Sequence, residues 1–244
     1  KGYFTLELKA AFQLPGHIVS TFVRKAIPLI LNEVLWSVGL NVYFWCYARL
    51  DEASIPAISI GEICNMFATV LACGTASAVS VLIGTELGAG RLKEAKANCK
   101  KLMGLDLMIG AAGAALSCIL ALVLPNLYNL SPELRHTATI ISFIMGVLCP
   151  FQFLYGFCFF YAHRWGLGRG LLVGFAYGLL DMLLDSGYLW VIPVPVAILM
   201  GILLPGRLPL WAAVLIIQTL MYIKVIPALM ILKKGKWVRN ITAA

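Results

Sequence analysis

Residues 102–124 read LMGLDLMIGAAGAALSCILALVL, and Asp106 is the single charged side chain in this run. A helix that crosses the hydrocarbon core of a bilayer needs about 20 mostly apolar residues. The run is preceded by a cluster of basic residues, Arg91, Lys93, Lys96, Lys100 and Lys101. An apolar run of this length beside a basic loop is typical of a transmembrane helix.

The composition of the whole chain agrees with this interpretation. Of 244 residues, 61% are hydrophobic and 12% are charged, whereas soluble domains have about 45–50% and about 25%. The mean hydropathy is +0.91. A chain of this size has too little interior to hide so much apolar surface from water. A soluble enzyme or a nucleic-acid-binding domain is therefore excluded, and we expect the lipid bilayer to surround the chain.

Five further apolar runs flank the first one. The predicted spans are 26–48, 55–87, 102–124, 137–161, 171–204 and 208–232. They predict an all-α polytopic membrane protein with six transmembrane helices. We expect an interfacial segment or linker at 1–24, the membrane domain at 25–233 and a basic cytoplasmic tail at 234–244. The fifth run is too long for one straight span, and Pro193 and Pro195 predict a break or kink in it.

The basic residues alternate between the loops. Fifteen of the nineteen Lys and Arg residues precede the first span, follow the second, follow the fourth or follow the sixth. The other loops hold Arg49, Arg135 and Arg207. Because basic loops stay in the cytoplasm, we expect both termini to be cytoplasmic and the protein to lie in the cytoplasmic membrane. The net charge of +8 thus indicates topology, and no nucleic-acid partner is expected.

Ionisable residues inside a span are candidate functional groups, because burying a charge in hydrocarbon is costly. Glu33 lies in the first span beside Asn32. A carboxylate in such a place is able to bind a proton or, with neighbouring oxygens, a sodium ion. The alternative is a structural carboxylate that is hydrogen-bonded to another helix.

Asp181 and Asp185 are spaced as neighbours on one helical face. They are either a coupled pair of carboxylates or a solvated helix end. Lys224 lies inside the sixth span, where it snorkels or pairs with an acid. Glu62 and Asp106 lie near span ends, so we expect them to reach the interface.

No catalytic or metal-binding pattern is present. The seven cysteines form no CxxC pair, and the three histidines lie far apart. We therefore predict no enzyme activity, no metal site and no cofactor other than a coupling ion, Na⁺ or H⁺.

Four stretches resemble the multidrug and toxic compound extrusion (MATE) family: residues 24–39 (RKAIPLILNEVLWSVG), 84–96 (GTELGAGRLKEAK), 185–195 (DSGYLWVIPVP) and 233–240 (KKGKWVRN). The resemblance implies a transporter of twelve helices in two six-helix lobes, of which this chain resembles the second. It further implies export of drugs or metabolites driven by Na⁺ or H⁺ entry. Glu33 matches the carboxylate of the family's seventh helix. The partner would be the missing N-terminal lobe or a second copy of the chain.

Residues 161–184 depart from the family. The acid of the family's Gly-Gly-Asp-Thr motif is absent there, and the window is weakly similar to the thiamine-binding S-component of a vitamin importer. Two alternatives therefore stay open, a membrane substrate-binding subunit of a vitamin importer and an inactive lobe fragment. For an exporter, we expect Glu33, Asn32, Asp185 and Asp181 to couple the ion. Trp36, Tyr43 and Trp190 are candidates for lining a cavity that takes a small organic substrate, cations included.

Overall fold

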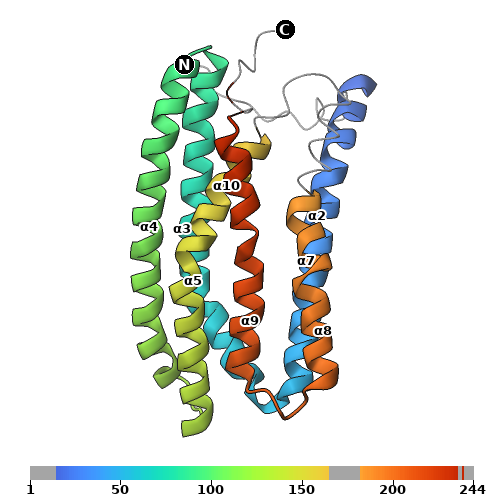
Figure 1. The fold of residues 1–244 in the computed structure, drawn as a ribbon, viewed down its shortest axis with the longest axis vertical. Coiled ribbons are helices and arrows are strands. Elements are labelled where there is room, and N and C mark those ends of the chain that lie inside the picture. Colours follow the sequence, from blue (N-terminus) through green and yellow to red (C-terminus); the bar gives the residue numbers. More distant parts are fainter. Residues whose placement is uncertain (1–14, 165–181, 236–237, 239–244) are drawn as a thin grey trace.

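The computed structural model of the protein describes residues 15–164, 182–235 and 238, and this part of the chain is helical, without a strand. Its elements are α2 (Gly16–Leu50), η1 (Glu52–Ser54), α3 (Ile55–Gly88), α4 (Leu92–Leu127), α5 (Pro132–Arg164), η2 (Leu183–Gly187), α7 (Tyr188–Val191), α8 (Pro193–Leu203), α9 (Leu210–Ile223) and α10 (Val225–Lys233). Figure 1 shows long helices that lie side by side and run alternately up and down. The predicted all-α membrane fold is confirmed.

Five described segments are long and apolar enough to cross a membrane, namely 52–88, 92–127, 132–158, 185–203 and 210–230. They correspond to the last five predicted spans. The first predicted span lies within α2, which is not among the five, so the total of six stays a prediction. α2 also runs without interruption across the predicted boundary between residues 24 and 25. Residues 1–14, 236–237 and 239–244 lie outside the described part of the chain.

The helices form two groups with a third layer between them. In Figure 1, α3, α4 and α5 lie together on one side, α2 lies beside α7 and α8 on the other, and α9 with α10 lies between. Glycines permit the close approaches within the groups. A Cβ on Gly201 of α8 would lie 3.2 Å from the Cα of Cys46 on α2. A Cβ on Gly110 of α4 would lie 3.1 Å from the Cβ of Phe153 on α5.

Proline explains two breaks in the later helices. Pro193 has no N–H to donate to the preceding turn, and the chain is interrupted at Ile192 between α7 and α8. The expected break in the fifth run is thus confirmed. Pro227 likewise has no N–H for the carbonyl of Ile223, and there α9 ends and α10 begins, with Lys224 at the junction.

The loops divide the described charges between the two ends of the bundle. The α3–α4 turn and the end of α10 lie at the top of Figure 1, while the α2–α3, α4–α5 and α8–α9 connections lie at the bottom. The top end carries Arg91, Lys93, Lys96, Lys100, Lys101, Lys233 and Lys234. The bottom end carries Arg49, Arg135 and Arg207. The folded chain therefore preserves the asymmetry that the loops predict.

Candidate functional site

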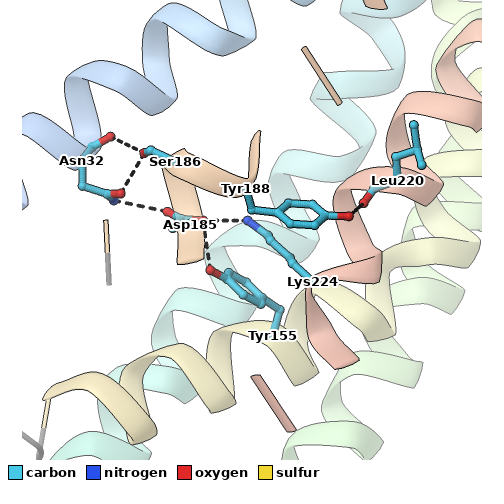
Figure 2. Close-up of polar contacts among 7 residues, drawn as sticks. All are labelled: Asn32, Tyr155, Asp185, Ser186, Tyr188, Leu220 and Lys224. Atoms are coloured by element: carbon cyan, nitrogen blue, oxygen red, sulfur yellow. Dashed lines mark hydrogen bonds and ion pairs between the residues drawn. The ribbon is translucent and has the colours of Figure 1, made fainter. Parts of the chain in front are cut away.

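Five polar side chains meet inside the bundle and are here called the polar cluster: Asn32, Tyr155, Asp185, Ser186 and Lys224. They come from α2, α5, η2 and the junction between α9 and α10. Figure 2 shows Asn32, Tyr155 and Lys224 converging on the carboxylate of Asp185, and Ser186 against Asn32. A group of polar side chains from four separate elements is costly to assemble in a membrane protein and marks a candidate functional site.

The centre of the polar cluster is an ion pair. The Nζ of Lys224 lies 2.6 Å from the Oδ1 of Asp185. Both residues are buried, with relative exposures of 5% for Lys224 and 8% for Asp185. Taking two charges out of water is expensive, and mutual attraction compensates for it only in good geometry with further hydrogen bonds. The other members of the polar cluster supply those bonds.

Asn32 contacts the second oxygen of the carboxylate, and Ser186 contacts Asn32. The Nδ2 of Asn32 donates to Oδ2 of Asp185 at 3.2 Å. The hydroxyl of Ser186 lies 2.7 Å from Oδ1 of Asn32 and 2.8 Å from its main-chain oxygen, and its single proton is donated to either. This contact fixes the amide of Asn32 with its NH₂ group toward the carboxylate.

Tyr155 contacts both charges of the ion pair. Its hydroxyl donates to Oδ1 of Asp185 at 3.0 Å, the same oxygen that Lys224 contacts. Its ring lies under the ammonium, with Nζ 4.0 Å from the ring centroid, which is within the range of a cation–π interaction. Tyr155 therefore stabilises the carboxylate with its hydroxyl and the ammonium with its ring.

Irregular backbone positions the charged groups. Asp185 and Ser186 lie in η2, a short π-helical turn, and such turns occur frequently at functional sites. Lys224 lies at the proline-induced break between α9 and α10. The hydroxyl of Tyr188 donates to the carbonyl of Leu220 at 2.7 Å, just before this break. The contact ties α7 to α9 beside the ion pair (Figure 2).

The structure brings together only part of the predicted ion-coupling set. Asn32 and Asp185 meet, and Asp185 is buried instead of forming a solvated helix end. Glu33 lies on the exposed side of α2, outside the polar cluster. Consecutive residues of an α-helix point about 100° apart, so the inward orientation of Asn32 turns Glu33 away. Asp181 lies outside the described residues, as do 165–181 of the window that departs from the family.

The predicted cavity residues are placed differently. Tyr43 is buried in the apolar core, and Trp36 and Trp190 pack against that core. The Nε1 of Trp190 donates to the carbonyl of Leu35 at 3.0 Å. None of the three lines the apolar groove of about 310 Å³ between α5 and α9–α10. Its lining includes the two chain neighbours of Lys224 but not Lys224 itself, and comprises Leu148, Phe151, Leu154, Thr219, Tyr222, Ile223, Val225, Ile226 and Leu229.

Sequence reasoning missed two members of the polar cluster and misplaced one acid. Tyr155 and Ser186 lie in or beside apolar runs, where a single hydroxyl carries no distinctive signal. Asp106 was expected at the interface, but it is 2% exposed and its Oδ2 has no hydrogen-bond partner. The packing of α4 against α3 and α5 buries it beside a cavity of about 130 Å³.

Among the described residues, no three His, Cys, Asp or Glu side chains are grouped to hold a metal ion.

Comparison with known proteins adds one finding. The family model MatE matches residues 28–163, which is more than half of the chain. No curated protein and no solved structure matches. The matched segment contains Asn32 and Tyr155, whereas Asp185, Ser186 and Lys224 lie after it. The polar cluster therefore joins the matched segment to the remainder of the chain.

Proposed function

This chain belongs to the MatE family, and from this premise we propose that it is one lobe of a cation-coupled exporter in the cytoplasmic membrane. Family membership and the apolar helices make it a multi-pass membrane protein and a MATE-type transporter, a class whose usual role is multidrug efflux. The proposal adds the coupling ion, Na⁺ or H⁺, and its binding site.

The observation that carries the proposal is the buried contact between Asn32 and Asp185. The two residues are separated by 153 positions in the chain, and both side chains are buried. A membrane-embedded carboxylate marks a cation or proton pathway by default. The polar cluster also offers oxygen atoms of Asp185, Asn32, Ser186 and Tyr155, which suit a hard cation such as Na⁺. Asp185 is therefore the proposed cation-binding carboxylate, with Asn32 orienting it.

The substrate and the partner are proposals of the same kind. We expect a small organic substrate, cations included, and retain Trp36 and Trp190 as candidate contacts because each is only half buried. Tyr43 keeps the same predicted role, although it is buried in the core. The second half of the transport path would come from an N-terminal lobe or from a second copy of this chain.

The test is export of ethidium by cells that express the full chain. We expect the wild type to lower cellular ethidium and Asp185→Asn to abolish this effect. Because Asp185→Asn leaves Lys224 buried without a counter-charge, the double variant Asp185→Asn/Lys224→Met is measured as well. It removes both charges, so it should be present in the membrane and still inactive.

The matched control is Glu33→Gln, which neutralises the exposed acid next to Asn32. We expect this variant to keep at least half of the wild-type export. Export at the wild-type level by the double variant contradicts the proposal. No export by the wild type contradicts a second copy of this chain as the other half of the transport path. Loss of export in Glu33→Gln alone transfers the coupling role to Glu33 and contradicts the assignment to Asp185.

A further inference from the structure

We propose that Lys224 is a tethered cation that occupies the Asp185 site in the resting state and is displaced when the coupling ion binds. The inference rests on the proposed function, because it concerns the carboxylate assigned there. It adds a residue that competes with the ion and so sets how tightly the ion binds.

The contacts of Asp185 support this role. Oδ1 accepts from Lys224 and Tyr155, and Oδ2 accepts from Asn32. Among the described residues, each contact of the carboxylate is thus made by a donor, and the positively charged donor is the ammonium at 2.6 Å. A second cation at the same oxygen would be repelled at this distance in a low-dielectric interior. Binding of Na⁺ or H⁺ to Asp185 therefore requires that Lys224 withdraw.

A neighbour of Lys224 stabilises its ammonium whether or not the carboxylate is in contact with it. The face of the Tyr155 ring already lies 4.0 Å from Nζ, and an aromatic face stabilises a cation without taking its proton. In addition, Lys224 lies at the break between two helices and not within a continuous helix. A backbone that lacks the regular hydrogen-bond ladder there adjusts at lower cost than an intact helix.

The exchange adds one positive charge to the polar cluster. With Lys224 on Asp185 the pair is neutral overall. With an ion on Asp185 the ammonium carries a charge without a counter-charge, which the face of the Tyr155 ring stabilises. Each arriving cation thus moves one charged side chain on the α9–α10 junction. This movement links ion binding to a shift between α7 and α9, which Tyr188 connects.

The experiment uses the full chain in lipid nanodiscs and compares the wild type with Lys224→Met, Lys224→Arg and Asp185→Asn/Lys224→Met. Two probes are applied: the shift of the melting temperature in NaCl relative to choline chloride, and labelling of Asp185 in choline chloride by a hydrophobic carbodiimide, located by mass spectrometry. Carbodiimides add to the protonated carboxylic acid, so labelling reports a proton on Asp185 in place of the ammonium.

We expect Lys224→Met to bind a replacement cation more readily than the wild type does. Either the Na⁺ concentration for half-maximal stabilisation falls at least tenfold, or labelling of Asp185 rises at least tenfold. Lys224→Arg should behave like the wild type, and the double variant should respond to neither probe. If Lys224→Met does not fold, Lys224→Gln, which keeps a hydrogen-bond donor, is measured in the same way.

Equal responses of the folded Lys224 variant and the wild type to both probes overturn the tethered-cation proposal. The same result follows if Lys224→Arg behaves like Lys224→Met, because the tethered charge would then be irrelevant. Neither outcome alters the export test of Asp185. Conversely, if Asp185 proves dispensable for export while Lys224→Met gains cation binding, the proposed function fails and the ion competition remains.

Discussion

The ammonium of Lys224 and the carboxylate of Asp185 form a buried ion pair of 2.6 Å between the α9–α10 junction and η2. The two residues are 39 positions apart in the chain. Breaking a buried pair by removing one partner costs about 3–5 kcal/mol, whereas replacing both partners with apolar groups is often nearly neutral. This asymmetry leads to the first prediction.

Asp185→Asn alone should lower the stability of the purified chain by about 3–5 kcal/mol. The double variant Asp185→Asn/Lys224→Met should recover most of this loss, because no charge then remains buried. Chemical or thermal unfolding in detergent measures both values. A double variant as unstable as the single variant would show that the ion pair does not account for the loss.

Asn32→Ala should destabilise the chain by about 1–3 kcal/mol, because it leaves buried partners in the polar cluster without their hydrogen bonds. The matched control is Asn41→Ala on the same helix. Asn41 is exposed, and its Nδ2 donates to the carbonyl of Ser37 one turn earlier on the same helix. The control should change stability by less than about 0.5 kcal/mol. Similar losses in the two variants would contradict the assigned role of Asn32.

Asp106→Asn should keep or raise the stability of the chain, in contrast to Asp185→Asn. Asp106 is as buried as Asp185, but its Oδ2 has no hydrogen-bond partner. The side chain of Thr75 is a hydrogen-bond partner of this carboxyl, but among the described residues no ion pair offsets its charge as Lys224 does for Asp185. A neutral amide therefore lowers the cost of burial. A melting temperature that falls as far as in Asp185→Asn would mean that the charge of Asp106 stabilises the fold.

Gly201→Val should destabilise the contact between α8 and α2. A Cβ at this position already lies 3.2 Å from the backbone of Cys46, and overpacking of a fitted contact costs about 1–3 kcal/mol. Gly74→Val on α3 is the control, because its added Cβ has no neighbour within 4 Å. The two melting temperatures are compared in the same detergent. Equal values would show that α8 and α2 separate without cost.

Single cysteines should report the orientation of the bundle in a Cys73→Ser background. Ser131→Cys and Pro205→Cys lie in connections at the weakly basic end, and Ala89→Cys lies in the turn at the strongly basic end. By the positive-inside rule, a membrane-impermeant maleimide should label the first two on intact cells. Ala89→Cys should be labelled only after permeabilisation. The reverse pattern would place the basic end outside.

Local information in the sequence was sufficient to predict the membrane helices. Apolar runs of the required length occur at 55–87 and 102–124, and the described helices α3 and α4 contain them. Pro193 predicted the interruption that separates α7 from α8. These features depend on composition and on the hydrogen bonds of a single segment, which the sequence displays directly. The ends of α4 were less predictable, because its basic first turns continue the same helix beyond the apolar run.

The composition and the distribution of charged residues determined that this protein is a membrane bundle with one strongly basic end. The Asn32 and Asp185 candidates also came from the sequence, since a polar group in an apolar run is visible without coordinates. Only the tertiary structure decided that these two meet, that Lys224 neutralises Asp185, and that Glu33 faces away. The reason is geometric: one residue along a helix changes direction by about 100°, and contacts across 39 or 153 positions depend on how whole helices pack.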